Sequence, residues 1–83
     1  MDLGRAVALY KKACDGRDAS GCTRLGYRHA RGETVSRDEA LAVELYGKGC
    51  AGGDPWGCAY QGEAYFNGRG VRRDKARAIP LLK

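Results

Sequence analysis

The feature that most constrains this chain is a pair of cysteines that occurs twice at a constant interval. Cys14 and Cys22 have seven residues between them, and so do Cys50 and Cys58. Each cysteine of the first pair lies 36 residues before its counterpart in the second. A fixed period of this size is typical of proteins in which one supersecondary unit is stacked on the next. We therefore expect a solenoid.

Apolar residues in the first half of each period recur every three to four positions, as they do along one face of a helix. They are Ala6, Val7, Leu9 and Tyr10, then Ala42, Val43, Leu45 and Tyr46, then Ala78, Ile79, Leu81 and Leu82. This pattern predicts a first helix in each unit, over roughly residues 3–14, 39–50 and 75–83. Aspartates precede these helices as candidate N-caps, at Asp2, Asp38 and Asp74.

A second helix is predicted in each complete unit, over about residues 19–31 and 55–67. The turn before it offers glycine for the left-handed end of the first helix, at Gly16 or in Gly52-Gly53. Asp18 and Asp54 then cap the second helices, which end at Gly32 and Gly68. Gly47 and Gly49 fall inside a predicted helix, where each costs up to ~1 kcal/mol relative to alanine.

Two helices and two turns per period predict an all-α fold of antiparallel hairpins in a single domain, residues 1–83. Repeat 1 covers about residues 2–37 and repeat 2 about residues 38–73, while residues 74–83 form a partial third repeat or a capping helix. No apolar run reaches the roughly 20 residues of a membrane span. No targeting segment is recognisable in the chain.

The order of these residues resembles the Sel-one-like repeat (SLR) family, and in particular its cysteine-rich, disulfide-containing bacterial branch. The resemblance rests on the paired cysteines and on Leu25-Gly26, His29, Gly32, Val35, Asp38 and Ala42. It implies a right-handed α/α solenoid similar to tetratricopeptide repeats, serving as a scaffold or adaptor for other proteins. Some cysteine-rich members bind β-lactams, which gives the alternative of a small-molecule binding protein or weak hydrolase.

The cysteines are interpreted as one disulfide per repeat, Cys14–Cys22 and Cys50–Cys58. Free buried thiols are one alternative, and metal or redox chemistry is another. Zinc sites usually use ligand pairs two to four residues apart, and His29 is the only histidine. A redox site would more typically show Cys-x-x-Cys. We expect no metal and no cofactor. Disulfides would place the protein outside the cytoplasm, in the periplasm or secreted.

The net charge is +5, with basic residues spread along the chain. Solvation explains such a surface, and a preference for acidic proteins is the other interpretation. No nucleic-acid motif accompanies the charge, so no such partner is expected. Tyr10, Tyr46, Tyr65 and Phe66 are predicted to pack within and between units. For Trp56 two interpretations remain, edge packing or a binding anchor.

The predicted function is a scaffold that holds a protein or peptide in a concave groove lined by the first helices. Off the apolar stripe, these helices carry residues that would form a ladder across it: Arg5, Ala8, Lys12, Leu41, Glu44, Lys48 and Arg77. No enzymatic activity is predicted. Ser20 and Ser36 are the only serines, and neither has a lysine arranged for acylation. His29 is expected to pack or form a hydrogen bond between helices.

Overall fold

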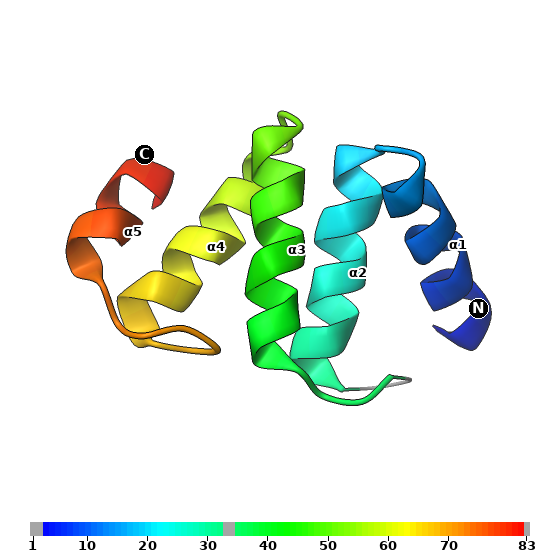
Figure 1. Ribbon diagram of the computed structural model, residues 1–83, viewed down its shortest axis with the longest axis horizontal. Helices are drawn as coiled ribbons and strands as arrows, with labels where there is room; N and C mark the ends of the chain where they lie inside the picture. The colour runs from blue at the N-terminus through cyan, green and yellow to red at the C-terminus, as the bar shows by residue number, and fades with distance from the viewer. Residues whose placement is uncertain (1–2, 33–34, 83) are drawn as a thin grey trace.

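The protein forms a row of helices connected by short turns (Figure 1). The structure is a computed structural model, and it describes residues 3–32 and 35–82. Within these residues it contains helices and turns but no strand. The helices are α1 (Leu3–Asp15), α2 (Ala19–Arg31), α3 (Glu39–Ala51), α4 (Pro55–Asn67) and α5 (Lys75–Leu82). The predicted helices are confirmed, with ends that differ by at most one residue.

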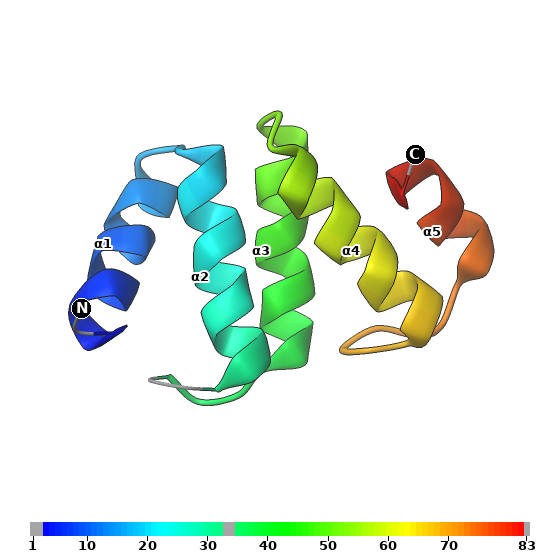
Figure 2. The same ribbon diagram turned by 180° about the vertical axis from the view of Figure 1, so that it is seen from behind.

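Each helix packs against the next, so that α1 and α5 lie at opposite ends of the row (Figure 1). α2 also contacts α4, whereas α1 makes no such contact with α3, nor α3 with α5, in the part of the chain that is described. Seen from behind, α4 crosses in front of the upper part of α3 (Figure 2). The row therefore closes on the side of α2 and α4 and opens on the side of α1, α3 and α5.

Aspartate caps begin the helices as predicted. A carboxylate oxygen accepts a hydrogen bond from a backbone N–H two or three residues later in every case described: 3.3 Å for Asp18, 3.0 Å for Asp38, 3.1 Å for Asp54 and 3.0 Å for Asp74. Asp2 lies outside the described residues. α2 and α4 end at Gly32 and Gly68, which have φ values of 65° and 70°. These left-handed caps fix where the chain turns from one hairpin to the next.

The turn inside each hairpin differs from the prediction in the first unit. Its left-handed residue is Arg17, with φ of 68°, and not Gly16. In the second unit the equivalent residue is Gly53, with φ of 97°. In both units this residue directly precedes the aspartate cap, so the geometry of the turn selects the position. The first unit holds an arginine there, in a conformation that L-residues rarely adopt.

The core lies mainly where α3 meets α2 and α4. Ala6, Ala42 and Ala78 are buried in all three units. The rest of the predicted apolar stripe is fully buried only on α3, where Leu45 is 6% exposed. Its counterpart Leu9 on α1 is 57% exposed, which corrects the prediction for the first unit. α3 has a packed helix on each side, whereas α1 has one neighbour.

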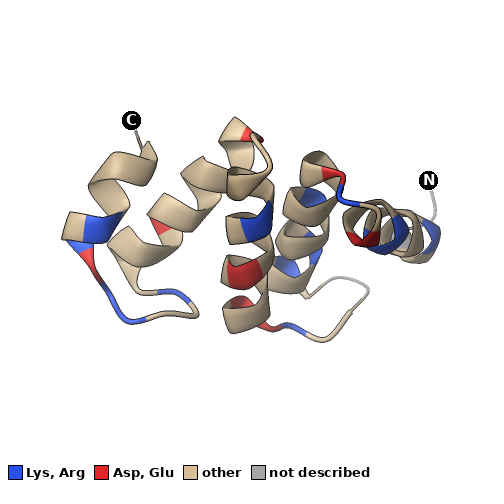
Figure 3. Cartoon of the chain, turned by 45° about the horizontal axis from the view of Figure 1, so that its top comes forward, with Lys and Arg blue, Asp and Glu red and all other residues tan. Residues whose placement is uncertain are grey.

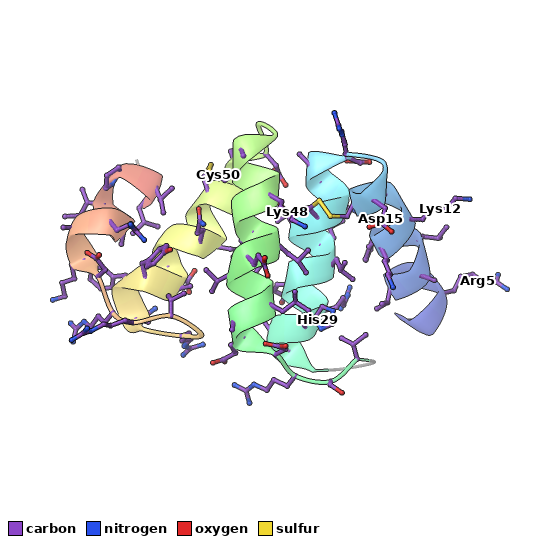
Figure 4. The ribbon with its side chains drawn as sticks, viewed as in Figure 1. Arg5, Lys12, Asp15, His29, Lys48 and Cys50 are labelled. Carbon is purple, nitrogen blue, oxygen red and sulfur yellow. A yellow bond between two sulfur atoms is a disulfide. The ribbon has the colours of Figure 1, made fainter. Side chains whose placement is uncertain are left out.

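Both predicted disulfides are present in the structure, Cys14–Cys22 and Cys50–Cys58, and the described residues contain no free cysteine. Each joins α-carbons 4.5 Å apart and links the last turn of one helix to the first turn of the next (Figure 4). Closing so short a loop contributes roughly 2–3 kcal/mol by the chain-entropy model. Each complete hairpin therefore carries its own covalent link.

Glycines within the helices mark the closest approaches between them. A Cβ at Gly49 of α3 would overlap Thr23 Oγ1 of α2 and lie 3.0 Å from the carbonyl oxygen of Ala19. A Cβ at Gly57 of α4 would lie 2.7 Å from the backbone nitrogen of Cys50. These glycines lower helix propensity, but they allow backbones to approach more closely than any larger residue would.

Candidate functional site

The residues predicted to form a ladder lie on α1, α3 and α5. All are exposed except Leu41, which is half-buried. Figure 4 shows Arg5 and Lys12 pointing away from the other helices at the α1 end, with Lys48 on α3. Because these helices do not contact one another, the structure does not gather the seven residues around one hollow. Their binding role stays a prediction.

The opposite side, between α2 and α4, carries a cluster of aromatic rings centred on Tyr60. The ring centroid of Tyr60 lies 5.1 Å from that of Tyr46 on α3 and 5.8 Å from that of Tyr27 on α2. Trp56, one turn earlier on α4, lies 6.0 Å from Tyr60. These separations suit favourable tilted ring contacts. The side chain of Tyr60 on α4 therefore contacts aromatic rings on both α2 and α3.

Two hollows flank the Tyr27–Tyr60 pair, and both tyrosines line each of them. The hollow that includes Trp56 has a volume of about 240 Å³ and is called the Trp56 hollow. The hollow that includes Glu63 has a volume of about 220 Å³ and is called the Glu63 hollow. No residue of the predicted ladder lines either one.

Tyr46 forms the buried end of the aromatic cluster, with 6% of its surface exposed. Burial raises the pKa of Tyr46 to about 12, because the phenolate would lose its hydration. The charges that Tyr60, Tyr27 and Glu63 could carry contribute to this rise in the same direction. Tyr46 is therefore a neutral structural residue beneath the cluster at ordinary pH.

The rim of the aromatic surface on α2 is basic. The guanidinium of Arg24 lies 5.9 Å from the ring centroid of Tyr10, and those of Arg28 and Arg31 lie 5.7 and 5.5 Å from that of Tyr27. Arg31 also donates to Tyr27 Oη at 3.2 Å. α2 contains no acidic residue, as its colouring in Figure 3 shows. Stacking of this kind holds the guanidinium planes close to the rings.

Sequence reasoning missed Tyr27 and Tyr60 because neither repeats at the 36-residue interval. The counterpart of Tyr60 is Arg24, that of Tyr27 is Glu63, and that of Trp56 is Ser20. A pattern defined by residues that recur at this interval does not include such positions. The available signal was local, since Trp56 and Tyr60 are four residues apart and so share one face of a helix.

The remaining candidates have structural roles. His29 is half-buried, and its Nδ1 donates to the carbonyl oxygen of Ser36 at 3.3 Å, so its hydrogen bond joins α2 to the following turn and not to another helix as expected. Phe66 is 41% exposed, and the ammonium of Lys75 on α5 lies 5.4 Å from its ring centroid, so this ring packs only in part, against the next unit. The described residues include no group of three metal-ligating side chains, and none of their helices is long and apolar enough to cross a membrane.

Comparison with protein-family models places the architecture in a known class. The model described as Sel1 repeat matches residues 2–18, 19–54 and 57–83, which is nearly the whole chain. The chain belongs to the Sel1 repeat family. Its matched units begin at α2 and α4, so the family unit pairs α2 with α3, a different starting point from that of the predicted repeats. No curated protein matches the chain.

Solved structures similar to this Sel1 repeat chain carry the same fold. Cysteine rich protein B of Helicobacter pylori superposes with a TM-score of 0.93 at 27% identity, over 98% of this chain and 61% of that one. A protective antigen of uropathogenic Escherichia coli with an SLR fold gives 0.85 at 31% identity, over 90% of this chain and 16% of that one. The Sel1 repeat chain thus spans less than two thirds of each. The predicted all-α solenoid with one disulfide per complete repeat is confirmed.

Proposed function

We propose that this chain is a scaffold module that binds a segment of a protein or peptide along the face formed by α2 and α4. The observation that carries the proposal is the pair of adjacent hollows, about 240 and 220 Å³, that share Tyr27 and Tyr60. Pockets for drug-sized molecules measure roughly 300–1,000 Å³. Each hollow therefore suits one side chain of a larger partner, and the two together suit neighbouring side chains.

The ladder predicted from the sequence is the second candidate surface for this function. Its residues are exposed, which a binding surface requires, but they are spread over helices that do not contact one another. Exposed aromatic residues beside a hollow are the more usual centres of protein interfaces. The α2–α4 face has such a residue in Trp56, which is 66% exposed.

The two disulfides also bear on the cellular compartment in which the proposed scaffold works. Two disulfides within 83 residues are typical of proteins that fold in an oxidising environment. The similarity to a cysteine rich protein of Helicobacter pylori agrees with this. The proposed scaffold therefore works outside the cytoplasm, in the periplasm or as a secreted protein.

Selection of binding peptides from a random display library, with the disulfide-bonded chain as target, tests the function. We expect selected peptides to bind the native chain and not the reduced, denatured chain. Trp56→Ala should weaken their capture strongly. Combined replacement of Arg5, Lys12, Lys48 and Arg77 by alanine should leave capture unchanged, with the helical circular dichroism of both variants intact.

Two results would contradict this proposal. If no peptide is enriched over the denatured chain, the scaffold function is wrong. If the fourfold variant loses capture while Trp56→Ala retains it, the partner binds the face formed by α1, α3 and α5.

A further inference from the structure

The Trp56 hollow combines an exposed aromatic anchor with a basic rim. Trp56 stands beside Tyr60 and exposes 66% of its surface, so a partner side chain can contact it without displacing another residue. Tyr27 also lines the hollow. Tryptophan and tyrosine provide large contact areas at small cost in side-chain entropy, which makes this wall suited to an apolar or aromatic side chain.

Two arginines of α2 border the same hollow, Arg24 and Arg28. Each is stacked over a tyrosine ring, and Arg24 has no ion pair among the described residues. One carboxylate also lines the hollow, that of Asp54, but its Oδ1 already accepts the backbone N–H of Trp56 at 3.1 Å. Two arginines and one carboxylate line this hollow, which leaves its lining with a net charge of +1.

The Glu63 hollow has more carboxylates in its lining than the Trp56 hollow. Glu63 and Glu39 contribute carboxylates to its lining, and Glu39 is paired with Arg37 at 2.9 Å. Three arginines line it as well, so its net charge is also +1, but it contains one carboxylate more than the Trp56 hollow. Two carboxylates therefore oppose an acidic partner at the Glu63 hollow, against one at the Trp56 hollow, so the Trp56 hollow is the better fit for an acidic partner.

We propose that the Trp56 hollow binds an acidic peptide segment. In this arrangement one apolar or aromatic side chain of the segment packs against Trp56 and Tyr60. Carboxylates on the neighbouring residues of the segment accept hydrogen bonds from Arg24 and Arg28, which are strong when both groups are charged. The inference rests on the proposed function, and it adds the class of partner and the residues that select it.

The test uses three short peptides with blocked ends, so that no terminal carboxylate contributes. The first has one phenylalanine flanked on both sides by glutamates, the second replaces every glutamate by glutamine, and the third keeps the glutamates but replaces phenylalanine by glycine. Binding to the disulfide-bonded chain is measured by titration calorimetry. Trp56 is the only tryptophan of the chain, so its fluorescence reports contact at this hollow.

We expect the first peptide to bind with a change in Trp56 emission, and the other two to bind at least about tenfold more weakly. Arg24→Gln and Arg28→Gln should each weaken the first peptide by about tenfold, and added salt should weaken it further. Arg72→Gln, in the turn between α4 and α5, is the matched control and should change binding little.

Equal binding of the glutamate and glutamine peptides would overturn the acidic preference while leaving the proposed function in place. If the third peptide, with glycine in place of phenylalanine, binds as tightly as the first, the Trp56 hollow is not the site. Unchanged Trp56 emission on binding of the first peptide would show the same. No binding of the first peptide, in a chain that does capture library peptides, would also reject the inference. Failure of both experiments would reject the proposed function itself.

Discussion

Arg17 adopts a left-handed backbone conformation that its counterpart Gly53 accepts without strain. For a residue with a Cβ this conformation costs roughly 1–2 kcal/mol. Glycine removes the strain but loses more backbone entropy on folding, about 0.5–1 kcal/mol. The two units thus contain the same turn with different local energies.

Arg17→Gly should therefore raise the free energy of unfolding by about 0.5–1 kcal/mol, measured by urea denaturation without reductant. Gly53→Arg is the matched control. A Cβ at Gly53 meets nothing within 4 Å, so that only its φ opposes the change. It should lower stability by a similar amount. A destabilised Arg17→Gly variant would mean that the arginine side chain makes a contact worth more than the strain.

Ionisation of Tyr46 lowers the stability of the folded chain at alkaline pH. Its pKa is about 12 in the folded chain and 10.0 for an unperturbed tyrosine. Below pH 10 the phenol is neutral in both states, so the folded state loses nothing. Between pH 10 and about pH 12, Tyr46 is ionised mainly in the unfolded chain. The free energy of unfolding therefore falls by about 1.4 kcal/mol for each pH unit.

Comparison of Tyr46→Phe with the unaltered chain isolates this effect, because the other tyrosines are common to both. From about pH 9 to about pH 11, the unaltered chain should lose about 1 kcal/mol more unfolding free energy than the variant. Chemical denaturation at each pH measures the difference. Parallel losses in the two proteins would show that Tyr46 ionises normally.

The elements pack at distances that individual glycines decide. Gly49 faces Thr23 and Ala19 of α2, while its counterpart in the first unit is Ala13, whose Cβ faces Gly21 of α2. From the sequence alone, a glycine inside α3 has only an unfavourable effect, because it lowers helix propensity. The packing of α2 on α3 gives the physical reason for it.

Gly49→Ala should destabilise the chain by about 1–3 kcal/mol through overpacking, although alanine favours the helix by up to ~1 kcal/mol. Gly47→Ala in the same helix is the control. Its Cβ would lie 2.7 Å from Nε2 of Gln61, the end of a flexible side chain that can move aside. Thermal or urea denaturation should therefore find Gly47→Ala neutral or stabilising. Equal losses at both positions would contradict the packing argument.

Each disulfide links the two helices of one hairpin. Joint replacement of Cys50 and Cys58 by alanine should lower the unfolding free energy by about 2–3 kcal/mol. Without reductant, the intact mass of the unaltered chain should fall four hydrogens below the all-thiol value, with each bridge confined to its own unit in a peptide map. A bridge between units would contradict the arrangement.

At the scale of the whole molecule, burial depends on place in the row. Among the residues that the structure describes, α3 is covered by α2 and α4, whereas α1 and α5 each have a single packed helix beside them. Leu9, Leu45 and Leu81 occupy equivalent positions, yet only Leu45 is fully buried. A solenoid stabilises its interior units more than its ends for this reason.

Leu45→Ala should cost about 2–5 kcal/mol, and Leu9→Ala less than about 1 kcal/mol. Circular dichroism during urea denaturation measures both. Equal costs would contradict the link between burial and place in the row.

The sequence alone determined the helices, their aspartate caps and the position of the cysteine pairs, because these are local features that recur with the period. The tertiary structure decided which surface the repeats form. Tyr60, Tyr27 and Trp56 occupy non-equivalent places in the period, and they meet only because α2 and α4 close on each other while α1, α3 and α5 do not. The curvature of the row depends on how closely helix backbones approach one another, and that approach is set by contacts between residues distant in the chain.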